Sequence, residues 1–177
     1  AKNLKKKVNF QILGENTKVD RDILERLEAP LTHLLRNAVD HGLEASEQRT
    51  AEGKAAQGSL TLEARHRAGM LSISVTDDGR GIDPEAIKRK VVDKGLGSKE
   101  MVASLSRAEL MDFLFLPGFT TSGSVTEISG RGVGLDVVHS MVQEVGGSVR
   151  CESAPGQGTR FHMQLPLSLS VVPTILV

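Results

Sequence analysis

The stretch from 31 to 42, LTHLLRNAVDHG, constrains the fold of this chain more than any other. Its apolar residues recur at spacings of three and four, which predicts a helix with one buried face. Its polar residues at i, i+4, i+7 and i+8 share a second face, which could meet a polar ligand or simply face water. Gly42 follows where a left-handed cap would end the helix. The apolar set is Leu31, Leu34, Leu35 and Ala38, and the polar set is His33, Asn37, Asp40 and His41.

Length and composition predict one globular domain in the cytoplasm. A chain of 177 residues can bury a large core, and its 22 basic and 22 acidic residues leave no net charge to attract nucleic acid or an anionic membrane. The sequence has no Trp or Tyr to stack on single-stranded bases and no apolar run long enough to span a membrane. The lone Cys151 fits a reducing compartment. We therefore expect neither nucleic acid binding nor direct membrane insertion.

Two kinds of hydrophobic periodicity follow one another along the chain. Period-two alternation predicts strands, including a hairpin that turns at Ala68-Gly69. Helical spacing predicts helices, one starting at Pro84 and one at a capping box that begins with Ser106. This order argues for an α+β two-layer sandwich, with a mixed, mostly antiparallel sheet and helices on one face. The expected strands are 7–13, 60–64, 71–75, 148–153 and 159–165, and the expected helices, besides 31–42, are 23–27, 84–95, 106–114 and 135–145.

The segments on either side of the 31–42 helix carry their own expectations. Asp20 or Asp22 is expected to cap the helix before it. Pro30 is expected to kink that helix or to restart it as a first helical residue. The segment Glu44–Gly58 is charged and rich in alanine, which predicts an exposed helical turn or loop without a core of its own.

A short acidic motif ends the second strand of the predicted hairpin. Asp77 is followed closely by Gly79 and Gly81. A carboxylate in this place can accept a hydrogen bond from an exocyclic amine while the bare backbone lies against a flat ring. Taken alone, the same pattern also fits an ordinary Asp-Gly turn.

A second group of glycines, Gly130-Arg-Gly-Val-Gly134, leads into the helix at Leu135. Successive N–H groups at a helix start can bind phosphate, and Arg131 could add a bidentate contact. A merely flexible loop is the alternative. The stretch matches neither the dinucleotide fingerprint nor the P-loop. The whole segment 116–134 is long and rich in glycine and serine, which is typical of a lid.

A third glycine pair, Gly156 and Gly158, precedes the last strand. A hairpin turn is the first interpretation of this pair. Thr159 near a base or a phosphate is the second.

The order of these boxes resembles the ATP-binding fold (Bergerat or GHKL fold) shared by gyrase, Hsp90, MutL and histidine kinases. The resemblance is closer still to the catalytic domain of the CheA-type chemotaxis histidine kinases. It is carried by His33–Gly42, Phe115-Leu-Pro-Gly-Phe-Thr-Thr121 and Ser129-Gly-Arg-Gly-Val-Gly-Leu-Asp136. It extends from about residue 8 to residue 169.

The resemblance implies roles for individual residues. Asn37 would coordinate Mg²⁺ bridging the phosphates of ATP, Asp77 would accept from the adenine amino group, and the lid would order around the nucleotide. His33 and His41 would each be a proton relay, a γ-phosphate ligand or a structural group at the site edge. Lys90 would reach the nucleotide or remain solvated. The expected nucleotide contacts are Asn37, Asp40, His41, Asp77, Gly79, Gly81, Ile82, Lys90, Gly130, Arg131, Gly132, Val133, Gly134, Leu135 and Thr159, and the catalytic candidates are His33, Asn37, His41 and Arg131.

The resemblance also implies what the reaction would be. ATP-hydrolysing clamps carry a Glu four residues before the Asn as a base for water, and here that position is His33. That histidine favours a histidine autokinase over a clamp, and the intact ligand positions favour it over a nucleotide-sensing module without catalysis. Some relatives also carry a lysine inside the lid, but Thr121–Val125 contains none.

In such a kinase the γ-phosphate would pass to a histidine on a separate phosphoacceptor domain, between the subunits of a homodimer. Further partners would be a dimerisation domain, a downstream regulatory domain and, indirectly, a response regulator. Residues 1–168 would be the catalytic domain, monomeric as a fragment, and 169–177 the start of a linker to the missing regulatory domain.

Overall fold

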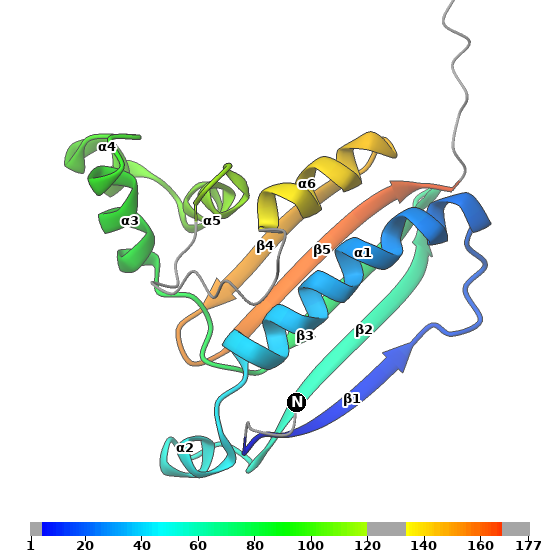
Figure 1. Cartoon of the computed structure of the whole chain (residues 1–177), viewed down its shortest axis with the longest axis horizontal. Helices are drawn as coiled ribbons and strands as arrows, with labels where there is room; N and C mark the ends of the chain where they lie inside the picture. Colours follow the sequence, from blue (N-terminus) through cyan, green and yellow to red (C-terminus); the bar gives the residue numbers. More distant parts are fainter. Residues whose placement is uncertain (1–4, 120–133, 168–177) are drawn as a thin grey trace, which may run out of the picture.

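The computed structural model describes residues 5–119 and 134–167. In this part of the chain five strands form one sheet in the order β1-β2-β3-β5-β4. Only β1 runs parallel to its neighbour, and the other pairs are antiparallel. The sheet is therefore mixed and mostly antiparallel, as predicted (Figure 1). The strands are β1 (Lys7–Leu13), β2 (Gln57–Arg67), β3 (Met70–Asp77), β4 (Ser148–Ala154) and β5 (Gly158–Pro166).

The predicted hairpin joins β2 to β3. Ala68 and Gly69 both have positive φ, 51° and 74°, which is the backbone of a tight hairpin turn. The register that this turn sets places Leu60 opposite Asp77. On its other side, β3 pairs Asp77 with Thr159 of β5. The two residues singled out from the sequence thus lie side by side on the sheet.

One long helix, α1 (Arg21–Asn37), crosses the sheet. Asp20 caps it by accepting a hydrogen bond from the backbone N–H of Asp22. The expectation that Pro30 restarts the helix is wrong, because Pro30 lies buried inside α1. A helix can carry an internal proline when its other turns are held by packing. Ile23, Leu27 and Leu34, on the same buried face, supply that packing.

A wider turn, η1 (Ala38–Gly42), continues α1 as a single stretch of π-helix. The backbone N–H of Leu43 donates to the carbonyl of Ala38 at 2.8 Å, five residues back. Gly42 was expected to adopt a left-handed cap, but its φ is not positive. A glycine at this position instead leaves room for Asp77, because a Cβ on Gly42 would lie 3.2 Å from Oδ2 of Asp77.

The segment after η1 corrects another expectation. It forms helix α2 (Ser46–Ala51), and the strand β2 already begins at Gln57. Arg49 of α2 and Glu44 before it are each only 1% exposed. The segment therefore has a small polar core of its own, which a count of charged residues does not reveal.

The remaining helices agree with the predicted starts. Asp83 caps α3, Pro84 is its first residue, and Ser106 with Glu109 forms the expected capping box of α5. The helix α4 was not predicted. The bounds are α3 (Pro84–Asp93), α4 (Lys99–Ser104), α5 (Arg107–Asp112), the 3₁₀ turn η2 (Phe113–Phe115) and α6 (Leu135–Glu144).

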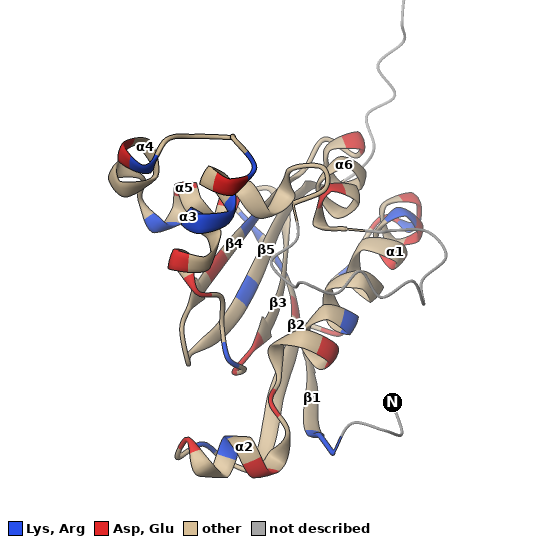
Figure 2. Ribbon diagram, turned by 60° about the vertical axis from the view of Figure 1, so that its left-hand side comes forward, with Lys and Arg blue, Asp and Glu red and all other residues tan. Residues whose placement is uncertain are grey.

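The core lies between one face of the sheet and the helices α1 and α6 (Figure 1). Alternate residues of β3 and β5 point into it, among them Ile73 and Met163, at 4% and 0% exposure. Asp77 and Thr159 continue the same alternation at the strand ends, so they face the helical layer. Acidic and basic residues are interspersed along the helices (Figure 2). No helix in the described residues is long and apolar enough to cross a membrane.

Candidate functional site

The carboxylate of Asp77 is buried at the end of β3, with the residue 6% exposed. Its Oδ1 accepts a hydrogen bond of 2.9 Å from the backbone N–H of Gly79. Burial raises the pKa of Asp77 to about 6, against the opposing effect of backbone hydrogen bonds from Gly79 and Thr159. A buried carboxylate with a raised pKa at a strand end is a candidate recognition group.

Three glycines lie close to Asp77: Gly42 and Gly79 approach its carboxylate, and Gly158 approaches its backbone carbonyl. A Cβ on Gly79 would lie 2.1 Å from the carbonyl oxygen of Gly42, and one on Gly158 would lie 2.0 Å from that of Asp77. Gly158 also has a φ of 86°. Gly79 and Gly158 therefore each permit a backbone-to-backbone approach that no other residue allows.

The turn after β3 packs against the turn between β4 and β5. Gly81 has a φ of 69°, and a Cβ there would lie 2.0 Å from the carbonyl oxygen of Ala154. The backbone N–H of Ile82 donates to Oγ of Ser153 at 2.8 Å. Gly81 and Ile82 are thus held beside Thr159, as the prediction of one site requires.

Ser153 is a residue that the sequence analysis missed. Its buried hydroxyl donates to the carbonyl of Gly158 and lies 3.0 Å from the Thr159 hydroxyl. It pairs directly with Thr159 across β4 and β5. The period-two register of the two strands could have placed it there.

A hollow of about 380 Å³ opens beside Asp77. It reaches from this carboxylate to α5, where Arg107 and Met111 line it. Asn37 is not among its lining residues. The hollow therefore covers the Asp77 end of the candidate site but not the face of α1. The sheet residues that line it include Asp77, Cys151, Ser153, Gly158 and Thr159.

Asn37 is the last residue of α1 and is half-buried. Its Nδ2 lies 3.1 Å from Nε2 of His33, one helical turn back. Burial, followed by the charge of Arg36, lowers the pKa of His33. The neutral ring can therefore accept a hydrogen bond from the Asn37 amide. That arrangement directs the amide oxygen away from His33 and makes it available as a metal ligand.

The η1 turn connects the Asn37 end to the Asp77 end. It starts directly after Asn37, contacts β3 and β5, and ends where Gly42 lies against Asp77. Nζ of Lys6 donates to the carbonyls of Val39 and Asp40 at 2.8 and 2.9 Å. These bonds hold a turn whose carbonyls have lost the regular helical pattern.

Comparison with known proteins agrees with this geometry. The family described as "Histidine kinase-, DNA gyrase B-, and HSP90-like ATPase" matches residues 26–169. The chain belongs to this ATPase family. The match includes α1 with Asn37, the strand end at Asp77 and the start of α6.

Individual relatives narrow the assignment. The chain is 45% identical to the chemotaxis protein CheA of Rhizobium meliloti over 97% of its own length, and 44% identical to that of Treponema pallidum over all of it. It spans 22% of each of these two relatives. Nearly the whole chain is thus similar to one segment of these chemotaxis proteins.

Solved structures confirm the fold. The catalytic domain of histidine kinase ThkA, in a nucleotide-free form, superposes with a TM-score of 0.56 at 19% identity, covering 94% of this chain and 81% of that one. A blue-light activated histidine kinase domain from Erythrobacter litoralis gives 0.54 at 18% identity, covering 90% of this chain and 52% of that one.

In this ATPase-family domain the helix α6 brings a third element to the site. Gly134 precedes α6, whose first residue is Leu135, and α6 packs on α1. The charge of Asp136 in its first turn reaches His33 and opposes the lowering of that ring's pKa. The start of α6 therefore lies near the Asn37 end. The predicted phosphate contacts Gly130, Arg131, Gly132 and Val133 fall outside the described residues, as does most of the predicted lid.

The other predicted contacts differ in exposure. Asp40 and His41 are exposed on η1. Nζ of Lys90 lies 5.8 Å from the ring centre of Phe119, and Lys94 donates to the carbonyl of Gly118 at 3.1 Å. Lys90 of α3 and Lys94 just after it thus lie beside the first residues of the predicted lid, the part of it that the structure describes.

Proposed function

We propose that this chain binds Mg·ATP and supports transfer of the γ-phosphate to a histidine on a separate phosphoacceptor domain. The observation that carries the proposal is the contact of η1 with the Asp77 strand end. It links the turn that follows Asn37 to the strand end at Asp77, although the two residues are 40 positions apart in the sequence, and it supports one shared site. Base recognition and metal binding can then act on a single nucleotide.

Each end of the site has a defined task in this proposal. Asp77 accepts a hydrogen bond from the 6-amino group of adenine, and Gly81 and Ile82 leave room for the flat ring. Asn37, oriented by His33, offers an amide oxygen to Mg²⁺, a hard cation that also takes phosphate oxygens and water. The ion would neutralise charge on the transferring phosphoryl group. The glycines before α6, with Arg131, would hold the phosphates.

A histidine in place of a base for water supports a kinase over a hydrolysing clamp. The Nε2 of His33 already faces the Asn37 amide. A ring used in this way is not available to activate an attacking water molecule. We therefore propose slow hydrolysis by the domain itself, with the phosphoacceptor domain as the productive partner.

The relatives are several times longer than this chain, and further partners follow from the kinase proposal. These are a dimerisation domain that makes the whole kinase a homodimer, a regulatory domain after residue 168 and, indirectly, a response regulator. The compartment proposed is the cytoplasm, which supplies ATP.

A titration with a fluorescent ATP analogue tests the proposal. The wild-type chain should bind it in Mg²⁺, and Asp77→Asn should weaken binding about 10- to 100-fold, the value of one charged hydrogen bond. Asp112→Asn, on the exposed end of α5, is the matched control. Equal binding by wild type and Asp77→Asn would count against the adenine assignment. Rapid, steady phosphate release by the chain alone would favour the clamp.

A further inference from the structure

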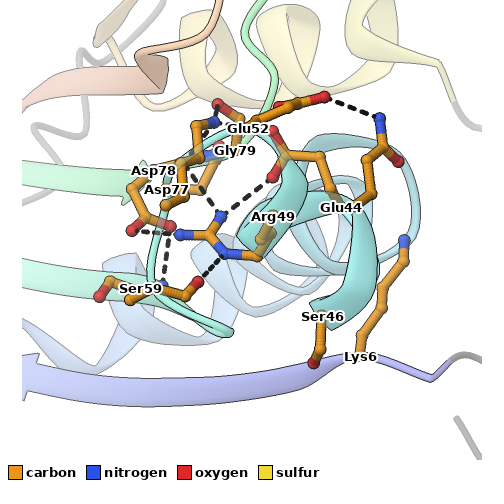
Figure 3. Close-up of polar contacts among 12 residues, drawn as sticks. Lys6, Glu44, Ser46, Arg49, Glu52, Ser59, Asp77, Asp78 and Gly79 are labelled. Atoms are coloured by element: carbon orange, nitrogen blue, oxygen red, sulfur yellow. Dashed lines mark hydrogen bonds and ion pairs between the residues drawn. The ribbon is translucent and has the colours of Figure 1, made fainter.

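Four charged side chains gather behind the Asp77 strand end, and we name them the Arg49 cluster: Glu44, Arg49, Lys54 and Asp78 (Figure 3). Two are basic and two are acidic. The side chains of Arg49 and Glu44 are 1% and 0% exposed, and the pair is joined at 3.0 Å. Lys54, 19% exposed, reaches the other oxygen of Glu44 at 2.7 Å. Arg49 and Glu44 are therefore buried as a pair, whereas the side chain of Asp78 is 45% exposed.

The hydrogen bonds of Glu44 show how closely the charges are matched. Burial alone would raise the pKa of Glu44, but the hydrogen bond from Lys54 and the charges of Lys54 and Arg49 outweigh it. The pKa is therefore held below its usual value. Buried ion pairs of this kind are often no more stabilising than apolar residues of the same volume. Fold stability alone is thus a weak reason for such a cluster.

The basic side chains also bind the backbone just after Asp77. Arg49 donates to the carbonyl oxygen of Asp78 at 3.2 Å and to its carboxylate at 2.9 Å. Lys54 donates to the carbonyl oxygens of Asp78 and Gly79 at 3.2 and 2.8 Å. Two consecutive carbonyls are thereby fixed by two buried or half-buried cations.

A peptide unit is planar, so fixing its carbonyl also fixes the direction of its N–H. The carbonyl of Asp78 shares a plane with the N–H of Gly79, which donates to Oδ1 of Asp77. The carbonyl of Gly79 shares a plane with the N–H of Arg80, which donates to the carbonyl of Gly42 at 2.9 Å. The first plane orients the Asp77 carboxylate, and the second holds the η1 turn that follows Asn37.

We propose that Arg49 and Lys54 are positioning residues for adenine selection, acting through the two peptide planes that follow Asp77. They touch no part of the nucleotide themselves. This inference rests on the proposed function, because it assumes that Asp77 recognises the 6-amino group. It adds to that function the claim that the preference of Asp77 for adenine depends on Arg49 and Lys54, two cations that do not touch the nucleotide.

The test compares ATP with purine riboside triphosphate, which lacks only the 6-amino group. Both would compete with a fluorescent ATP analogue on the whole chain, at pH 7.5 with Mg²⁺. Wild type should prefer ATP about 10- to 100-fold. Lys54→Met should lose most of this preference by weakening ATP alone, and Lys54→Arg should keep most of it. Lys88→Met breaks the part-exposed ion pair with Glu85 on α3 and should change the binding of neither nucleotide.

The same ratio separates failure of this inference from failure of the proposed function. If Asp77→Asn leaves the ATP preference intact, the adenine assignment itself is wrong. The positioning role is wrong if Asp77→Asn abolishes the preference but Lys54→Met retains it. It is also wrong if Lys54→Met weakens the binding of both nucleotides equally. Lys54→Gln, which keeps a donor but no charge, replaces Lys54→Met if that variant melts below the assay temperature. Arg49→Met should have the larger effect but can unfold the chain.

Discussion

The carboxylate of Asp77 lies against the backbones of Gly42 and Gly79 and accepts a hydrogen bond from the N–H of Gly79, whereas the amide of Asn37 is half-buried at a helix end and contacts the ring of His33. The Asp77 end is fixed by the fold before any nucleotide arrives. The Asn37 end offers an oriented oxygen in a more open setting. Under the proposed function, base recognition would thus be preorganised, and the phosphate end would be completed when the ligand binds.

The largest effect is expected from a substitution at Asn37, in the more open end of the site. Asn37→Asp in the intact kinase should lower labelling of the acceptor histidine from radioactive ATP by roughly 100-fold or more, comparable with loss of one transition-state contact. A carboxylate cannot donate to His33 and changes the charge at the metal. Asn9→Asp, the same change on exposed β1, should label normally. Unchanged labelling by Asn37→Asp would remove Asn37 from the mechanism.

The second prediction concerns the stability of the enclosed end. The folded-state pKa of Asp77, about 6, lies above the ordinary value of 3.8 for this carboxyl. Its contribution to stability is thus fully present below pH 3.8 and is lost as the pH rises through 6. At pH 7.5 the ionised carboxylate should cost up to about 3 kcal/mol. Asp77→Asn should therefore raise the free energy of unfolding at pH 7.5, measured with urea, but not at pH 4. A less stable variant at pH 7.5 would contradict this.

The third prediction uses pH to titrate base recognition. The ionised Asp77 carboxylate accepts from the 6-amino group more strongly than the protonated acid does, and its pKa is about 6 in the unliganded fold. The preference for ATP over purine riboside triphosphate should fall about tenfold between pH 7 and pH 5. The ratio cancels titration of the phosphates, which both nucleotides share. A ratio that does not change with pH would place base recognition on another group.

The smallest expected effect sharpens the role of His33. His33→Ala should weaken Mg²⁺-dependent ATP binding about three- to tenfold, the worth of one neutral hydrogen bond. His33→Gln, which can still accept from the Asn37 amide, should restore part of it. Binding measured in EDTA should change little in either variant. His66→Gln, on exposed β2, is the control, and an equal loss there would make the effect nonspecific.

The sequence predicted the parts of this molecule whose signals are local. Apolar alternation found the strands, and Ala68-Gly69 predicted the turn that sets the β2–β3 register. Asp77 and Thr159 were chosen separately, and the sheet pairs them. Their common face follows from the alternation of side chains along a strand. That they are neighbours does not follow, because the pairing of β3 with β5 is a long-range contact.

The missed features depend on partners distant in the sequence. Arg49 is charged, and a charged helix is usually exposed, but its carboxylate partner Asp78 lies 29 residues away. Pro30 was expected to interrupt a helix whose buried face in fact continues past it. Gly42 was assigned a conformational role, whereas its role is to make space for Asp77. In each case tertiary packing outweighed a local preference.

The π-helical turn η1 has a consequence for how this chain tolerates changes in length. Its wide hydrogen bond from Leu43 to Ala38 accommodates one more residue than an α-helical turn would. Deleting a single residue between 38 and 42 would restore ordinary helical pitch and leave the turn one residue shorter. The contact that Gly42 makes with Asp77 would then be displaced. Natural length variants should therefore avoid this turn and occur instead in exposed connections such as the one around Gly95.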